Sequence, residues 1–261
     1  MRIVRYQIKG KKPGYGILEN NLIKGFSHIP FSQFRKFSTS LPAVDTVYNV
    51  NEVKLLAPCL PSKIICLGKN YLSHVEEFNS DVPSVPLIFL KPPTSIVGSY
   101  EQIVLPRGSR RVDYEGELAV VIGKKAKNIQ QKQAHDYILG YTCFNDVSER
   151  HNQKLDGQWT RAKGYDTFAP LGPWIETEVN PDDLKLETYL NGELRQSART
   201  SDLIFKIPEL LHFISTIMTL IPGDVIATGT TSGVGKMNHG DVVEVKIEKI
   251  GNLKNFVVEQ K

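Results

Sequence analysis

Short apolar runs separated by turn-forming residues dominate the chain. Apolar or alternating runs bounded by Gly, Pro, Asn or Asp are typical of β-strands. Residues 187–195 predict a hairpin, because Asn191-Gly192 favours a type I′ turn. The last two apolar runs predict a terminal hairpin around Gly251-Asn252. The strands of that terminal hairpin are residues 241–247 and 256–259. The other predicted strands are residues 3–8, 15–18, 22–23, 63–67, 87–90, 102–105, 115–122, 140–145 and 224–227.

Helical spacing of apolar residues is confined to a few segments. Residues 207–220 predict the longest helix, because leucine and isoleucine recur there every three or four positions. Residues 70–78 and 130–137 predict shorter helices, and a helical turn is expected at Ser148. The first of these could be capped by Asn70 or by a capping box of Ser73 and Glu76. Strands outnumber helices, so the pattern predicts an α+β, mostly β fold.

The pattern divides the chain near residue 55. Residues 1–55 predict a small N-terminal β-rich domain and a connector, because residues 28–50 are polar and irregular and include two prolines. Residues 56–261 predict one larger domain that holds every candidate functional residue. A chain of 261 residues is long enough for one such domain with a small extension.

The charge pattern bears on the class of partner. The net charge is +4, and lysine and arginine are scattered, with the densest group at Arg107, Arg110 and Arg111. A nucleic-acid-binding surface usually needs a longer basic stripe, so we expect no nucleic-acid partner. The surplus positive charge suits a small anionic substrate.

Cysteine usage and apolar run length bear on location. Cys59, Cys66 and Cys143 include no C-x-x-C pair, which argues against a disulfide framework or structural zinc and predicts small buried side chains. The first nine residues lack a signal-peptide stretch, and no run approaches the ~18 apolar residues of a membrane span. We therefore expect a cytoplasmic protein without a membrane partner.

Three carboxylates are candidates for a metal site. Glu115 and Glu117 lie two residues apart on a predicted strand, so their side chains share one face. Asp146 follows another apolar strand, where a third oxygen ligand is well placed. An all-oxygen set favours a hard cation, Mg²⁺ or, as a close alternative, Mn²⁺. The pattern is equally compatible with Glu115 and Glu117 on the solvent face of a half-exposed strand.

His74 and Glu77 are candidates for a general base and its orienting partner. Residues three apart on a helix share a face, so the carboxylate can orient the imidazole and raise its basicity. Taken alone, the pair fits an ordinary surface helix better.

A glycine-rich segment, residues 228–236, follows an apolar strand. It is not a nucleotide-binding loop, because Thr230 and Met237 stand where a Walker motif requires Gly and Ser or Thr. Its amides and hydroxyls could hold a carboxylate, although a tight hairpin connection also explains the glycines.

Taken together, residues 63–245 resemble the fumarylacetoacetate hydrolase family. Any one motif is weak, but six of them occur in the family's order. These are Ile65 to Tyr71 with His74 and Glu77, Pro86 to Pro92, Asp113 to Leu118, Gly140 to Ser148, Lys163 to Thr167, and Thr228 to Gly235.

The resemblance implies a β-rich, barrel-like body with a few packed helices, usually as a homodimer. It matches Glu115, Glu117 and Asp146 to the metal ligands and His74 with Glu77 to the catalytic dyad. The resemblance also assigns substrate contacts to four further residues, which are Arg150, Gln153, Lys163 and Thr230. It counts Lys163 as catalytic as well. The chain departs from the family at Thr231, where proline is common, and we expect little consequence.

These assignments imply chemistry on a small 2-oxo or enol carboxylic acid through a metal-stabilised enolate. We expect hydrolysis of a C–C bond in a 3-acylpyruvate. Isomerisation, tautomerisation or decarboxylation of a ring-cleavage product such as 2-hydroxyhepta-2,4-diene-1,7-dioate, or of oxaloacetate, is the alternative. A non-catalytic, metal-stabilised binding protein is the alternative from another class, although such a protein would not need the His74–Glu77 pair.

Overall fold

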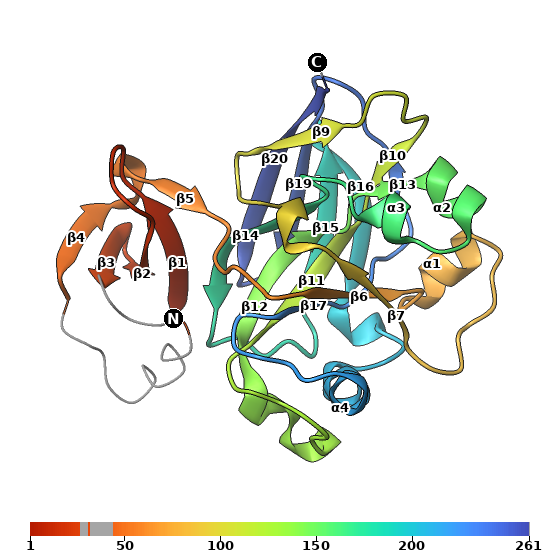
Figure 1. Ribbon diagram of the computed structural model, residues 1–261, viewed down its shortest axis with the longest axis horizontal. Helices are drawn as coiled ribbons and strands as arrows, with labels where there is room; N and C mark the ends of the chain where they lie inside the picture. The colour runs from red at the N-terminus through yellow and green to blue at the C-terminus, as the bar shows by residue number, and fades with distance from the viewer. Residues whose placement is uncertain (27–30, 32–43, 261) are drawn as a thin grey trace.

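The computed structural model describes residues 1–26, 31 and 44–260, and its elements are mostly strands (Figure 1). The predicted α+β, mostly β class is confirmed. The strands of the large sheet are β1 (Arg2–Gln7), β2 (Gly14–Glu19), β3 (Leu22–Phe26), β4 (Thr46–Asn49), β5 (Lys54–Leu56), β6 (Ile64–Gly68), β7 (Leu87–Lys91), β8 (Ile96–Val97), β11 (Gly116–Ile122), β12 (Ile138–Asn145), β14 (Ala169–Glu176) and β17 (Val225–Ala227).

This large sheet runs in the order β4-β3-β2-β1-β14-β12-β11-β17-β6-β7. Strand β1 pairs with β14, so the N-terminal strands, red and orange at one side of Figure 1, continue the sheet of the main body. Most neighbours are antiparallel, but β17 and β6 are parallel. Strand β11 lies between β12 and β17 near the centre, which buries all of its residues.

Two smaller sheets complete the body. One has the order β16-β15-β19-β20-β9, and the other has the order β13-β10-β18. The bounds are β9 (Gln102–Leu105), β10 (Val112–Tyr114), β13 (Ser148–Glu149), β15 (Lys185–Leu190), β16 (Glu193–Arg199), β18 (Gly235–Lys236), β19 (Val242–Ile247) and β20 (Gly251–Glu259). The predicted hairpin at residues 187–195 is confirmed as β15–β16.

The helices are few and short. The α-helices are α1 (Leu72–Glu77), α2 (Arg150–Asp156), α3 (Thr160–Lys163) and α4 (Ile207–Ile217). The 3-10 helices are η2 (Val50–Glu52), η3 (Pro93–Ser95), η4 (Gln131–Tyr137) and η5 (Thr200–Asp202). Helices α1, α2 and α3 gather at one side of the main body, and α4 packs elsewhere (Figure 1). Among the described residues, no helix is long and apolar enough to cross a membrane.

The alternation of side chains along β11 divides the core in two. Leu118 and Val120 enter a cluster that α4 also fills, whereas Ala119 and Val121 enter a second cluster with strands β6 and β14. Glu117 lies two residues before Ala119 on the strand, so its side chain is on the same face of the sheet as Ala119 and Val121. The three cysteines are free and buried, as predicted.

Several predicted boundaries were wrong. Helix α1 has no side-chain cap, because Asn70 bonds to the backbone of residues 205 and 228 and Ser73 contacts Thr231. Helix α4 ends before residue 220, because Leu220 exchanges backbone hydrogen bonds with Ala126.

The remaining corrections concern turns and the connector. Residues 130–137 form a 3-10 helix rather than an α-helix, and Ser148 lies in strand β13 before helix α2 begins. The terminal hairpin turns at residues 248–250, where Lys249 has a positive φ and Ile250 is buried. The predicted connector includes strand β4, which pairs with β3, and its residues 28–30 and 32–43 lie outside the described residues.

Asp224 fixes the start of strand β17. Its carboxylate is fully buried and accepts hydrogen bonds from the backbone and hydroxyl of Ser62 and from the backbone of Ile221. It also pairs with Lys63 at 2.5 Å. Strand β17 leads directly into residues 228–235, so this carboxylate anchors the approach to the glycine-rich segment.

Replacing Asp224 by Ala should destabilise the fold by about 3 kcal/mol, because it leaves buried donors unpaired and breaks a partly buried ion pair. Chemical denaturation measures the change. Glu193→Ala is the control, because the Glu193–Arg195 pair is exposed and its loss should barely move the midpoint. Equal midpoints for the two variants would contradict the anchoring role.

Candidate metal and catalytic site

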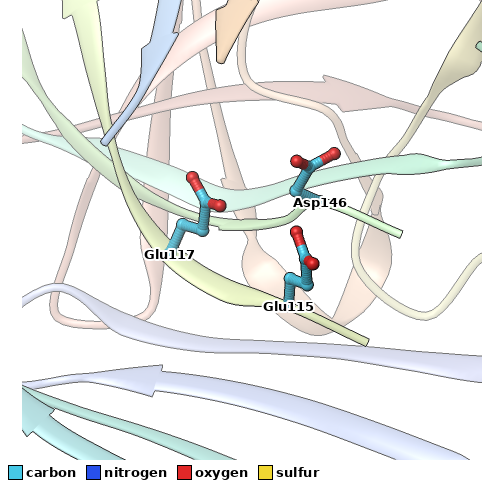
Figure 2. Close-up of side chains that lie close together, drawn as sticks. All are labelled: Glu115, Glu117 and Asp146. Carbon is cyan, nitrogen blue, oxygen red and sulfur yellow. The ribbon is translucent and has the colours of Figure 1, made fainter. Parts of the chain in front are cut away.

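Three buried carboxylates converge where strand β11 begins and strand β12 ends (Figure 2). One oxygen from each of Glu115, Glu117 and Asp146 lies within 4.8 Å of the others. Glu117 is on β11, Glu115 immediately precedes it, and Asp146 immediately follows β12. The pairing of Gly116 with Asn145 and the bond from the Asp146 N–H to the Glu115 carbonyl bring the strand ends together. The alternative of a solvent-exposed strand face is wrong, since these side chains are almost fully buried.

Two lysines hold the carboxylates from inside the protein. The Lys163 ammonium donates to Glu115 at 2.8 Å and to Asp146 at 2.6 Å. The Lys91 ammonium donates to the other oxygen of Asp146 at 2.5 Å and to the carbonyl of Val147 at 3.0 Å. Both lysines are almost fully buried, so these ion pairs compensate charges that water does not reach.

Arg150 forms a second layer of charge around Glu115. Its guanidinium pairs with Glu115 at 2.5 Å and with the buried Asp113 at 2.9 Å. It also donates to the side-chain oxygen of Gln153 at 3.0 Å. Arg150 begins α2, and Glu149 caps that helix by accepting from the Asn152 N–H. The helix start therefore fixes the arginine against the carboxylates.

The charges around the three carboxylates are unequal. Burial alone would raise the pKa of Glu115, but Arg150 and Lys163 hold that pKa below its usual range. Burial, with Asp146 and Glu115 nearby, raises the pKa of Glu117 well above its usual value. Among the described residues, no lysine or arginine pairs with Glu117, which accepts from the Gly229 N–H at 2.8 Å. An undercompensated, all-oxygen cluster fits a hard divalent cation.

His74 and Glu77 form the predicted pair on α1. The His74 Nδ1 lies 3.2 Å from a Glu77 oxygen, and the other Glu77 oxygen accepts from the Gly233 N–H at 2.9 Å. Burial lowers the pKa of His74, while Glu115 and Glu77 oppose the shift. The imidazole is therefore neutral near pH 7 and available as a base. The alternative of an ordinary surface helix is wrong for His74, which is 9% exposed.

A cavity of about 390 Å³ joins the dyad to the carboxylates. Its lining includes His74, Glu115 and Glu117 together with Lys163 and Arg150. Apolar side chains, further cations and two polar side chains also line the cavity; they include Phe78, Phe89, Trp159, Lys69, Arg111, Lys154, Gln153 and Thr230. All the residues predicted for the site line this cavity except Glu77 and Asp146, which contact residues that do.

The Thr230 hydroxyl is already engaged. It donates to the carbonyl of Gly116 at 2.9 Å and accepts from the Gln196 side-chain amide at 2.8 Å. The hydrogen of this hydroxyl therefore points to the backbone between the two glutamates. A substrate carboxylate at this loop would meet a hydroxyl whose proton is already committed to the backbone.

Three residues of this site were missed from the sequence. Lys91 ends an apolar strand, and a lysine in such a run is a usable signal, because a buried ammonium needs a carboxylate. Asp113 directly precedes the Tyr114-Glu115 motif, but its pairing with Arg150 depends on the fold. Gln196 comes from the β15–β16 hairpin, and no local sequence pattern marks it.

Sequence comparison assigns both parts of the chain. Residues 63–258 match the fumarylacetoacetate (FAA) hydrolase C-terminal family, and residues 1–58 match the family described as Rv2993c-like, N-terminal. A curated relative, oxaloacetate tautomerase YisK of Bacillus subtilis, is 44% identical over 231 residues, which are 81% of this chain and 75% of that protein.

Two solved structures show the same fold. The 2-hydroxyhepta-2,4-diene-1,7-dioate isomerase of Mycobacterium marinum is 43% identical, with a TM-score of 0.90 over 100% of this chain and 99% of the other. The maleylpyruvate hydrolase of Sphingobium sp. SYK-6, in complex with manganese(II) and pyruvate, is 30% identical, with a TM-score of 0.83 over 100% of both chains.

These relatives carry the names of a tautomerase, an isomerase and a hydrolase, so the family is one of enzymes. The acidic triad of this chain could bind a divalent metal, as the manganese complex of one relative illustrates. The family match covers most of the chain and contains the whole cavity. On these grounds the chain belongs to the fumarylacetoacetate hydrolase family.

Proposed function

We propose that this protein is a divalent-metal-dependent enzyme that converts a small anionic 2-oxo acid through its enolate. One observation carries the proposal: His74, which Glu77 orients, shares a cavity with Glu115 and Glu117 of a buried cluster of three carboxylates. Glu115, Glu117 and Asp146 would hold Mg²⁺ or Mn²⁺. When bound there, such a cation supplies Lewis-acid polarisation of the 2-oxo group and stabilises developing negative charge.

The chain's own residues supply the proton chemistry. Because Nδ1 of His74 faces Glu77, Nε2 is the free acceptor and can remove a proton from C3 of the substrate. Lys163 and Arg150 add positive charge around the resulting anion. Returning the proton from Nε2 to the 2-oxygen completes a keto–enol tautomerisation, and returning it to a different carbon completes an isomerisation.

Tautomerisation of oxaloacetate is our first candidate, although the sequence alone favours hydrolysis. The 44% identity to an oxaloacetate tautomerase over 81% of the chain supports this order. The chemistry needs only the dyad and a stabilised enolate. Loss of carbon dioxide from oxaloacetate would use the same stabilisation and is distinguished by its product.

Hydrolysis of a 3-acylpyruvate is the second candidate, favoured by the likeness to a maleylpyruvate hydrolase. In that reaction His74 would deprotonate a water, which attacks the 4-carbonyl. The C3–C4 bond then breaks, its electrons form the enolate of pyruvate, and a carboxylic acid leaves.

A substrate screen tests the proposal and separates the candidates. The protein is incubated with Mg²⁺ or Mn²⁺ and with oxaloacetate, acylpyruvates or dienedioates. Enol absorbance, pyruvate and carbon dioxide are measured separately. We expect acceleration of oxaloacetate enolisation without pyruvate release. Metal binding without turnover of any of these substrates would instead favour the non-catalytic binding protein.

Glu77→Gln should lower kcat by about 100-fold or more, because the variant loses the carboxylate that orients the base. Glu77 raises the pKa of His74, so its loss lowers that pKa further. His74 must be neutral to act, so activity falls as pH drops through its pKa. The acid limb of the kcat/KM profile should therefore move to lower pH in the variant. Glu76→Gln, on the exposed side of α1, is the control. Undiminished turnover in Glu77→Gln would remove the dyad assignment.

Metal binding should depend on Glu117. Titration calorimetry with Mn²⁺ should show one strong site per chain in protein first treated with a chelator. Glu117→Gln should weaken that site by about 100-fold, because it removes one of three anionic ligands. Glu19→Gln, an exposed glutamate, should bind like the wild type. Unchanged affinity in Glu117→Gln would place the cation elsewhere.

Lys69 and Lys154 should favour substrates with a second carboxylate. Both line the cavity, and among the described residues neither forms an ion pair. Lys69→Met should raise KM for oxaloacetate by about tenfold, the effect of losing one charge-assisted contact of about 1.5 kcal/mol. The KM for acetylpyruvate, which has no second carboxylate, should stay unchanged. Lys132→Met, outside the cavity, is the control. Equal changes for both substrates would refute this selectivity.

A further inference from the structure

Gln196 links elements that are distant in the sequence. It lies on β16, in a different sheet from β11, and its side chain is fully buried. Its oxygen accepts from the Gly116 N–H at 2.9 Å. Its nitrogen donates to the Thr230 hydroxyl and to the carbonyl of Thr231, both at 2.8 Å. Both ends of the amide are therefore committed to the site.

The contact at Gly116 lies between two of the three carboxylates. A Cβ at this position would lie 2.0 Å from the Thr188 hydroxyl and 3.3 Å from the Gln196 side-chain oxygen. Only glycine therefore lets the β15–β16 hairpin approach β11 so closely. The backbone that carries Glu115 and Glu117 is held from behind by Gln196.

The contacts at Thr230 and Thr231 reach the glycine-rich segment, which in turn contacts α1. The Thr231 hydroxyl lies 3.0 Å from the Ser73 hydroxyl, and the Gly233 N–H donates to Glu77 at 2.9 Å. One loop thus touches the carboxylate strand through Gln196 and the dyad helix through Ser73 and Glu77.

We propose that Gln196 is a positioning residue that sets the carboxylate cluster and the Thr230 loop relative to each other. Through Gly116 it fixes the spacing of Glu115 and Glu117, and hence the affinity for a divalent cation. Through Thr230 it fixes the loop against which a substrate carboxylate binds; this second part rests on the proposed function. The effect on metal binding does not require turnover.

The test uses Gln196→Met, which keeps the volume and removes all three hydrogen bonds. Calorimetry measures the affinity for Mn²⁺, and steady-state kinetics with oxaloacetate give kcat and KM. Chemical denaturation measures the stability. We expect about tenfold weaker Mn²⁺ binding, which is the lower end of the loss in affinity when a residue that holds the metal ligands is replaced. We also expect a rise in KM larger than the fall in kcat. Thr188→Val is the matched control, because the Thr188 hydroxyl is buried beside Gly116 without a hydrogen-bond partner in the described chain.

A double-mutant cycle with Thr230→Val tests the path through the loop. If Gln196 acts on KM through Thr230, its effect should shrink in the Thr230→Val background. Additive effects on KM, or a Gln196→Met variant that loses only stability, would overturn the proposal.

Should that variant not fold, Gln196→Glu keeps the shape and the acceptor for Gly116 but loses both donors. A wild-type KM in Gln196→Glu would overturn the proposal as well. If the wild-type protein has no turnover, the proposed function is wrong. The comparison of Mn²⁺ affinity between the wild type and Gln196→Met still tests the role of Gln196.

Discussion

The burial of several carboxylates at one end of an apolar strand is the constraint on which the site depends. A buried carboxylate is costly unless a cation or hydrogen-bond donors compensate it. Lys163, Lys91 and Arg150 compensate Glu115 and Asp146 within the described chain, whereas Glu117 receives one backbone N–H. The opposite pKa shifts of Glu115 and Glu117 follow from this unequal distribution. The protein thus neutralises part of the cluster and leaves the rest suited to a cation from solution.

The same constraint explains why three sheets meet at the site. Strand β11 supplies the carboxylates from the large sheet, and Asp113 on β10 of the small sheet positions Arg150. The β15–β16 hairpin of the third sheet supplies Gln196. Each contribution replaces contacts that water would make to buried polar groups. Packing and chemistry are therefore not separable here, because residues that satisfy the carboxylates also line or brace the cavity beside them.

The sequence predicted the elements that a local pattern marks. It did not predict elements whose conformation depends on pairing with a distant strand. Strand β11 was found because of its continuous apolar run, and helix α4 because of its apolar stripe. Strand β14 was missed, since Pro170, Gly172 and Pro173 are residues that usually interrupt strands. Its pairing with β1 and β12 outweighs that local signal.

The same distinction holds for the site. The spacing of Glu115 and Glu117 gave a shared face, but only the fold shows that this face is buried. The capping of α1 was wrong because Asn70 and Ser73 bond to residues more than 130 positions away. Thr231 stands where proline is common in the family, and its hydroxyl contacts the dyad helix at Ser73. Hydrogen bonds of this range leave no periodic trace in a sequence.

Differences in reaction among members of such a family must arise away from the shared chemistry. An enolate stabilised at the carboxylate end of the cavity is common to tautomerisation, isomerisation and C–C hydrolysis, so the residues at 74, 77, 115, 117 and 146 do not separate them. What differs is the substituent on C3 and the access of water to it. In this protein the cavity walls also include Phe78, Phe89 and Trp159 and the cations Lys69 and Lys154. Under the proposed function, apolar walls that limit water beside C3 would favour moving a proton over adding a hydroxyl, and the two lysines would favour a substrate that ends in a second carboxylate. Under the proposed function these further wall residues would select among reactions that the carboxylates and the dyad make feasible.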